Sequence, residues 1–467
     1  MRNQPEAPDE ADLFLMEQGQ EVHALARQMY CGDTPAQGEG LGRSTLDLCA
    51  RASIKTLFEA SVQAGPFVAR ADILCRHGDG WHVLEVKSSF SDSGNVSDYI
   101  DALAYTVMVF HRVGIPVTKS SLILLSRNYR YGDSVEQLFV PLDETDAVNA
   151  RVAEFEAQAD EVARVLLDPS RPIPKLVSAC RDCPAYETAC LGAGCNHTVL
   201  EIPRLQPATL QKLSNAGVVD AQQVPRDLKL NPSQQRAIAA IKSGETIVEP
   251  GLAATLETIH WPCYYLDFET VNTFLPLYPG IGCHRQLLTQ FSVHRREDMN
   301  RDPSHAEYLA NASRDCEREL ASALIDALGR EGSVMMYTGF EKQRIQALRE
   351  RFPEFGEPLE QISARLVDLA NIIRANVYHP EFHGSFSIKQ VLPALVPDLS
   401  YAGLNIGNGG TAVARFARMA KGEITGDAAQ ETRRQLLEYC NMDTYAMVKL
   451  HEVLVGLANS NGRAQRA

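Results

Sequence analysis

The chain has 467 residues, of which 45% are hydrophobic and 22% are charged, and its formal net charge is −14. This composition is ordinary for a globular protein, and the length favours about three domains. No run of about eighteen apolar residues exists and the amino terminus is acidic, so we expect no membrane span or signal peptide and a cytoplasmic protein. The negative charge argues against a protein that coats polyanions, although a local basic groove remains compatible with it.

The first part of the chain predicts helices between about residues 12 and 64, followed by a β-hairpin. Two alternating runs, 67–74 and 81–87, are joined by a turn that contains Gly78 and Gly80. Asp72 lies near the middle of the first predicted strand. Glu85 and Lys87 lie two residues apart, on one face of the second, and a helix over 99–113 is expected next.

This order of an acid, a hairpin and acid-x-lysine resembles the RecB-like branch of the PD-(D/E)XK nucleases, which includes CRISPR-associated members. The resemblance implies that Asp72 and Glu85 hold a divalent metal and that Lys87 helps to polarise the attacking water or the phosphate. The chain departs from that branch at Asp101, where a glutamine usually stands four residues before a tyrosine, here Tyr105.

Four of the eleven cysteines crowd into sixteen residues: Cys180, Cys183, Cys190 and Cys195. A disulfide framework is not expected in a cytosolic chain, and four thiolates fit either a tetrahedral zinc site or an iron–sulfur cluster. The RecB-like resemblance favours a [4Fe–4S] cluster over Zn²⁺. We expect Cys195 to be the fourth ligand, with Cys31 as the alternative.

The stretch YYLDFET, from Tyr264 to Thr270, predicts a strand with Leu266 and Phe268 on one face and Asp267 and Glu269 on the other. Two carboxylates on one face of a buried strand repel each other unless a positive charge lies between them. A divalent cation is the ordinary remedy. The alternative is an edge strand whose two acids are solvated.

Three later residues extend this pattern. Glu341 follows a predicted strand at the start of a helix, and Tyr439 and Asp443 lie at i and i+4 on one face of a late helix. The pattern resembles the tyrosine subclass of the DnaQ-like exonucleases (DEDDy type), which have an RNase H-like fold. The resemblance implies that Asp267, Glu269, Glu341 and Asp443 bind two Mg²⁺ or Mn²⁺ ions and that Tyr439 orients the attacking water. Most relatives have Asp where this chain has Glu341.

Taken together, these motifs resemble a bacterial family of formally unknown function that joins a RecB-like module, a cysteine cluster and a DnaQ-like module. We therefore expect an α/β protein with a PD-(D/E)XK nuclease-like domain and an RNase H-like mixed-sheet domain. The expected ranges are 1–178 for the RecB-like domain, 179–202 for the cysteine cluster, 203–256 for a helical connector, 257–458 for the DnaQ-like domain and 459–467 for a disordered tail.

The predicted function is metal-dependent hydrolysis of DNA or RNA, most readily as an exonuclease that by resemblance works 3′ to 5′. Its partners would be nucleic acid and a helicase or another repair or defence protein, because no Gly-x-x-x-x-Gly-Lys-Ser/Thr motif is present. Two alternatives stay open. One is a nucleic-acid-binding scaffold whose nuclease sites have decayed, and the other is a nuclease gated by a redox-sensing cluster.

Overall fold

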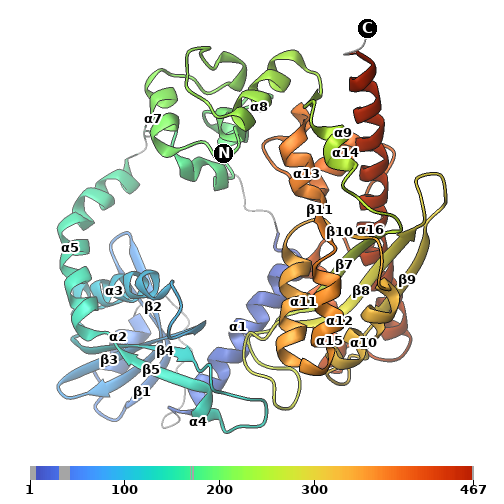
Figure 1. Ribbon diagram of the computed structural model, residues 1–467. Coiled ribbons are helices and arrows are strands. Elements are labelled where there is room, and N and C mark those ends of the chain that lie inside the picture. Colours follow the sequence, from blue (N-terminus) through green and yellow to red (C-terminus); the bar gives the residue numbers. More distant parts are fainter. Residues whose placement is uncertain (1–6, 31–42, 169, 171–172, 465–467) are drawn as a thin grey trace. The chain divides into compact units, whose positions relative to one another are not determined.

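The computed structural model describes residues 7–30, 43–168, 170 and 173–464 of a mixed α/β protein (Figure 1). The chain divides into two compact units. The first holds the described residues of 8–171 and 272–286, and the second holds Ala7 and the described residues of 172–271 and 287–467. Across the described parts of the chain, no helix combines the length and the apolar character needed to cross a membrane.

The first unit is a five-stranded sheet in the order β1-β2-β3-β4-β5, with all neighbours antiparallel except the parallel pair β3 and β4. Helices α3 and α5 pack on one face, where Leu103 and Val107 are fully buried. The elements are α1 (Glu10–Gln28), α2 (Arg43–Cys49), β1 (Thr56–Ala64), β2 (Phe67–His77), β3 (Gly80–Phe90), α3 (Val96–Arg112), β4 (Val117–Leu125), α4 (Val135–Leu138), β5 (Phe139–Asp143) and α5 (Thr145–Leu167).

The predicted hairpin is confirmed, since β2 and β3 pair antiparallel and close between His77 and Gly80. The expected helices between 12 and 64 are correct for α1 but wrong for 56–64, which form β1. Phe58, Ala60 and Val62 are buried and alternate with less buried residues, so the pattern there has a period of two. Glu and Ala in this stretch favour helices in isolation, and pairing with β2 overrides that preference.

The loop 272–286 belongs to the first unit although it joins two strands of the second. The Phe274 N–H donates to Gln18 Oε1 at 2.8 Å, and the Tyr131 N–H donates to the Ile281 carbonyl at 2.9 Å. Phe274 and Cys283 also pack into the core beside Ile73. The predicted range 257–458 thus includes a segment whose apolar side chains are buried in the core of the first unit.

The second unit begins with the cysteine segment and a helical connector, whose apolar side chains share one small core. Tyr186 from the cysteine segment and Leu210 and Leu213 from the connector are all buried there. The elements are η1 (Ser178–Asp182), α6 (Tyr186–Ala189), η2 (Val199–Glu201), α7 (Pro207–Asn215), η3 (Ala221–Gln223), α8 (Pro232–Ser243), β6 (Ile247–Val248) and α9 (Leu252–Leu256).

A second five-stranded sheet follows, in the order β11-β10-β7-β8-β9. Strand β7 lies at its centre, parallel to β10 and antiparallel to β8. The elements are β7 (Cys263–Val271), β8 (Leu287–Arg296), β9 (Ser304–Leu309), α10 (Glu317–Leu328), β10 (Ser333–Met336), α11 (Phe340–Arg351), η4 (Pro353–Phe355), α12 (Gly356–Ser363), β11 (Leu366–Asp368), α13 (Leu369–Asn376), β12 (Val377–Tyr378), η5 (Pro380–Phe382), α14 (Ile388–Leu395), α15 (Gly409–Ala420) and α16 (Gly426–Ala464).

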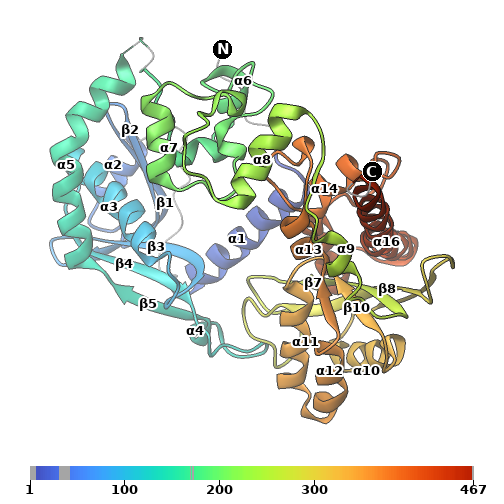
Figure 2. The same cartoon turned by 45° about the horizontal axis from the view of Figure 1, so that its top comes forward.

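Two layers of helices cover this sheet, with α10, α11 and α12 on one face and α16 on the other (Figure 2). Leu266 and Phe268 are buried in the core on the α10–α12 side, whereas Tyr265 belongs to the core that contains α16. Helix α16 runs to Ala464, so residues 459–464 are helical where a disordered tail was expected. Leu457 and Ala458, directly before this stretch, pack on the core.

Candidate metal centre

Strand β7 presents two acids toward the layer that contains α16. Because side chains alternate along a strand, Asp267 and Glu269 point away from the core that Leu266 and Phe268 fill. The central position of β7 argues against the alternative of a solvated edge strand. The amino-terminal turn of α15 lies near Glu269, because a Cβ added to Gly409 would be 4.0 Å from Glu269 Oε2.

Helix α16 brings the third acid to the same place. One carboxylate oxygen each from Asp267, Glu269 and Asp443 lies within 4.8 Å of the other two. Asp443 is buried and accepts a 2.5 Å hydrogen bond at Oδ1 from the Tyr401 hydroxyl. Tyr439, one turn earlier on α16, is 4% exposed, and its ring centroid lies 6.5 Å from that of Tyr401. The i and i+4 spacing therefore places Tyr439 beside the acid that it was predicted to accompany.

Glu341, in the first turn of α11, is the fourth predicted acid and does not belong to the group of oxygens within 4.8 Å. It is nevertheless 3% exposed, and its Oε2 has no hydrogen-bond partner in the protein. The pKa of Glu341 is raised to about 7, first by burial and then by the charges of Asp368 and Asp443. Asp368 also caps α13, since its side chain accepts from the Asn371 N–H.

The other three acids repel one another in the same way. Burial, followed by the charges of Asp443 and Glu269, raises the pKa of Asp267 well above its usual range. Burial and the charge of Asp443 raise the pKa of Glu269 to about 8. Burial raises the pKa of Asp443 to about 6, although the Tyr401 hydrogen bond opposes it.

One positive side chain stands close to this group. The Lys389 ammonium lies 5.8 Å from the Tyr401 ring centroid and 5.5 Å from that of Tyr439, and it donates to the Gly407 carbonyl at 2.8 Å. Its charge lowers the pKa values of Glu269 and Asp443, but those values remain above the ordinary range. Converging carboxylates with raised pKa values and an unpartnered buried oxygen on Glu341 fit the oxygen ligands that divalent cations take.

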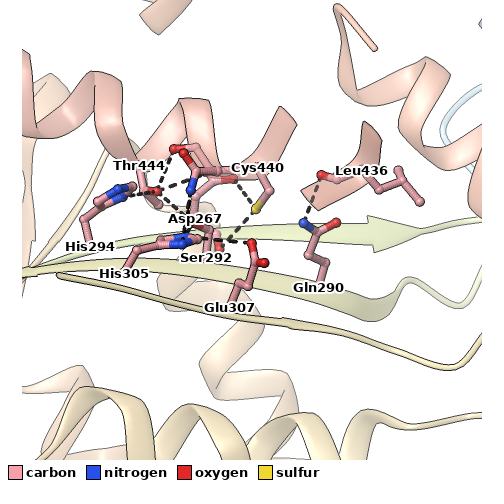
Figure 3. Close-up of polar contacts among 10 residues, drawn as sticks. Asp267, Gln290, Ser292, His294, His305, Glu307, Leu436, Cys440 and Thr444 are labelled. Carbon is pink, nitrogen blue, oxygen red and sulfur yellow. Dashed lines mark hydrogen bonds and ion pairs between the residues drawn. The ribbon is translucent and has the colours of Figure 1, made fainter. Parts of the chain in front are cut away.

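A layer of polar contacts joins strand β8 to helix α16, and the sequence patterns did not predict it (Figure 3). Ser292 Oγ lies 2.8 Å from both His305 Nε2 and Thr444 Oγ1, and His294 Nδ1 lies 2.8 Å from the same Thr444 oxygen. Gln290 Nε2 donates to the Leu436 carbonyl at 3.0 Å. A sequence pattern that could have predicted this layer was present, because polar residues occupy every second position of β8. Their side chains face α16 instead of solvent.

Cys440 is a further residue of this site that the sequence patterns did not single out. Its thiol lies 3.4 Å from Asp267 Oδ2, as Figure 3 shows. Burial, followed by the charge of Asp267, raises the pKa of Cys440 well above its usual range, so the thiol stays protonated and donates a hydrogen bond to the carboxylate. Cys440 therefore helps to fix the orientation of Asp267.

The first unit contains the other predicted acids. Asp72 on β2 is buried and accepts from the Val86 N–H at 2.8 Å. The Lys87 ammonium donates to Glu85 Oε1 at 2.8 Å, and the buried Glu85 Oε2 has no partner. Burial, followed by the charge of Asp72, raises the pKa of Glu85. The three residues thus lie on adjacent strands in one partly buried, charged cluster.

Two further residues lie at this cluster without having been predicted. His23, Glu59 and Asp72 each offer a ligand atom within 4.8 Å of the others, and His23 Nδ1 is 3.7 Å from Asp72 Oδ1. Burial lowers the pKa of His23, which favours the neutral imidazole that binds metals. Glu59 already forms ion pairs with Arg27 and Arg70. One histidine in an amphipathic helix gives no sequence signal that would have identified it.

The Asp101 and Tyr105 pair does not join this cluster. Asp101 forms an ion pair with Arg151 on α5 at 2.6 Å, and the Tyr105 hydroxyl donates to the Val68 carbonyl at 3.1 Å. Tyr99 is the tyrosine near Lys87, whose ammonium lies 5.7 Å from its ring centroid. The ion pair of Asp101 with Arg151 therefore connects α3 to α5.

The clustered cysteines Cys180, Cys183, Cys190 and Cys195 form no disulfide, and each is at least partly exposed. Cys180 and Cys183 lie in and directly after η1, and Cys190 directly follows α6. Within the described chain, no three of these sulfurs lie within 4.8 Å of one another. Zinc–sulfur bonds of about 2.3 Å would hold tetrahedral ligands roughly 3.8 Å apart, so this spacing is not that of a closed zinc site. Cys31 lies outside the described residues.

The comparisons with known proteins give one match. A family model described as a domain of unknown function (DUF2779) matches residues 264–387. This segment contains Asp267, Glu269 and Glu341 but not Tyr439 or Asp443, and the match carries no information on the predicted nuclease modules. No curated protein and no solved structure gives a significant match.

Proposed function

We propose that this protein is a divalent-metal-dependent nuclease that hydrolyses phosphodiester bonds of DNA or RNA through the acids of β7 and α16. The observation that carries the proposal is the convergence of oxygens from Asp267, Glu269 and Asp443 within 4.8 Å. By its resemblance to the DnaQ-like exonucleases and their RNase H-like fold, the activity is an exonuclease that works 3′ to 5′.

In this proposal Asp267, Glu269 and Asp443 hold Mg²⁺ or Mn²⁺, with Glu341 as the fourth acid. Bound there, such ions stabilise the charge on the entering and leaving oxygens of an in-line displacement. The Tyr401 hydrogen bond and the Cys440 thiol fix two of the carboxylates. Tyr439 orients the attacking water.

Lys389 supplies a positive charge that acts on Glu269 and Asp443. Its ammonium lies over the rings of Tyr401 and Tyr439, and the residue is exposed. An exposed ammonium beside the acids suits a phosphate of the substrate, because it is a compact, strongly charged donor.

A second site of the PD-(D/E)XK type is proposed in the first unit. Asp72 and Glu85 would hold one divalent metal, for which the neutral imidazole of His23 offers an additional ligand. Lys87, paired with Glu85, would polarise the attacking water or the phosphate. The buried, unpartnered Glu85 Oε2 supports a cation at this point.

The four cysteines are proposed to hold a [4Fe–4S] cluster, with Zn²⁺ as the alternative. The resemblance to the RecB-like branch supports the cluster over Zn²⁺, since four thiolates fit either group. The proposed partners are nucleic acid and a helicase or another repair or defence protein. Gating of the nuclease by the redox state of the cluster stays a proposal of the same kind.

The direct test is cleavage of end-labelled single- and double-stranded DNA and RNA in Mg²⁺ or Mn²⁺, comparing wild type with Asp267→Asn. Loss of one metal-binding carboxylate should lower the rate by about 100-fold or more, since bound metal contributes several kcal/mol to charge stabilisation. Asp398→Asn, at an exposed aspartate of the same unit, is the matched control and should cleave at the wild-type rate. Equal cleavage by wild type and Asp267→Asn would refute the assignment.

The rival function is a nucleic-acid-binding scaffold. One observation favours it for the first unit: Asp101 and Tyr105 make structural contacts with Arg151 and Val68. Wild-type protein that binds labelled nucleic acid but cleaves none of the four substrates in either metal would support the scaffold.

A further inference from the structure

A third cluster of metal-ligand side chains lies in the second unit, apart from the acids of β7 and from the cysteines. His197, Glu201 and His383 each offer one ligand atom within 4.8 Å of the other two. The two imidazole Nδ1 atoms converge on one oxygen, at 2.9 Å from His197 and 3.1 Å from His383 to Glu201 Oε2. The two rings stack with their centroids 5.1 Å apart.

We propose that His197, Glu201 and His383 bind one divalent cation of the zinc class through these three atoms. Two imidazoles and one carboxylate are a protein ligand set that Zn²⁺ takes with a fourth position left open. Bonds of about 2.0–2.2 Å would hold tetrahedral nitrogen and oxygen ligands roughly 3.4 Å apart. The hydrogen-bonded distances would therefore have to open by only a few tenths of an ångström.

Groups around the cluster fix the ligands in the orientation that a metal needs. The other oxygen of Glu201, Oε1, accepts from the Thr198 N–H at 2.7 Å, which leaves Oε2 for the cation. Metal at Nδ1 of His383 requires the proton on Nε2, and that atom lies 3.4 Å from the Glu381 carboxylate. A ligating histidine commonly donates its second ring N–H to such an acceptor.

The backbone holds the two halves of the site together before any ion binds. A Cβ added to Gly384 would lie 2.1 Å from the Glu201 carbonyl oxygen, so only glycine permits this approach. The Gly384 N–H donates to the Tyr378 hydroxyl at 3.1 Å, and His383 has a φ of 46°. A side chain other than glycine in the left-handed region is strained and persists only where its surroundings hold it.

The open side of the cluster faces a cavity of about 420 Å³ whose lining includes Glu201, His383, Arg181 and Arg204. A non-protein ligand can therefore reach the cation from solvent. The cation would connect the segment that follows Cys195 to the loop after η5, 182 residues apart in sequence.

The test separates a metal site from a hydrogen-bonded contact between two histidines and a glutamate. Glu201→Gln keeps an acceptor and a donor at this position but removes the charge, so the contact survives and zinc affinity falls. His383→Asn removes a ligand and tolerates the left-handed backbone. His260→Gln, at an exposed histidine of the same unit, is the matched control.

Protein purified without oxygen would be equilibrated with Zn²⁺ in excess Mg²⁺, dialysed, and assayed for zinc and iron per chain. We expect Glu201→Gln and His383→Asn each to lose one equivalent of zinc relative to wild type and to His260→Gln, with iron unchanged. Equal zinc in wild type and both variants would overturn the proposal.

Cobalt gives a readout that does not depend on either count. The Co²⁺ difference spectrum of wild type minus Glu201→Gln should contain visible ligand-field bands without a thiolate charge-transfer band. A thiolate band in that difference would assign the lost metal to the cysteines and overturn the proposal. If the variants fail to fold, X-ray absorption of the wild-type zinc protein decides, since the proposal requires imidazole scattering and its absence would refute it.

Discussion

Glu341→Gln is the substitution for which the structure gives the clearest thermodynamic expectation. The carboxylate is 3% exposed and its pKa is raised from 4.5 to about 7. A group whose pKa is higher in the folded state loses stability as pH rises through the folded value, because the folded protein binds the proton more tightly. Wild-type protein without divalent metal should therefore lose stability between about pH 5 and pH 8, a window set by these two pKa values.

The magnitude follows from the same two pKa values. Each pH unit between them is worth about 1.4 kcal/mol, so ionisation of Glu341 costs up to about 3 kcal/mol above pH 8 and less than about 1 kcal/mol at pH 5. This is an upper limit, because the side chain can turn toward water when it ionises. Glutamine carries no charge at either pH. The variant should thus be more stable than wild type at pH 8 and nearly equal to it at pH 5.

The assay is thermal unfolding by calorimetry in a chelator, at pH 5 and pH 8, for wild type, Glu341→Gln and Glu350→Gln. Glu350 is an exposed glutamate on the same helix, and its substitution should leave the midpoint within about 1–2 °C of wild type. At about 2–4 °C for each kcal/mol, Glu341→Gln should unfold up to roughly 10 °C higher than wild type at pH 8.

Saturating Mn²⁺ should reverse the order, because it binds the wild-type acids and stabilises the folded state by mass action. An advantage of Glu341→Gln that is absent at pH 8, or equal at both pH values, would refute the account of Glu341 as a buried charge among other acids.

Four further predictions concern the two units separately. Lys87→Ala should reduce any endonuclease activity and leave exonuclease activity intact, whereas joint loss in a folded variant would mean that the two sites are not independent. Leu266→Ala should destabilise the second sheet by about 2–5 kcal/mol in denaturant unfolding, against less than about 0.5 kcal/mol for the exposed Leu166→Ala. Tyr401→Phe removes the hydrogen bond that lowers the pKa of Asp443, so Mn²⁺ affinity measured by calorimetry should fall about tenfold near neutral pH, and an unchanged affinity would contradict this role. Protein purified without oxygen should be brown, and Cys183→Ser should be paler and hold less iron; a colourless wild type that loses one equivalent of zinc on Cys183→Ser would replace the [4Fe–4S] proposal by a zinc site.

The sequence alone predicted the elements in which apolar and polar side chains recur with a regular period. The alternation around Asp267 and Glu269, the hairpin of β2 and β3, and the i and i+4 pairing of Tyr439 and Asp443 are all found as expected. These patterns are local, since alternation along a strand and the turn of a helix fix which side chains share a face. They needed no knowledge of distant contacts.

The tertiary structure determined which distant residues those faces contact. It paired residues 56–64 as β1, continued α16 into the expected tail, and assigned the loop 272–286 to the first unit, because long-range burial outweighs local preference. It also brought His23 to Asp72 and His383 to Glu201, across 49 and 182 residues of sequence. Sequence spacing carries no information about such distances, since only packing of the whole unit determines which loops and helices become neighbours.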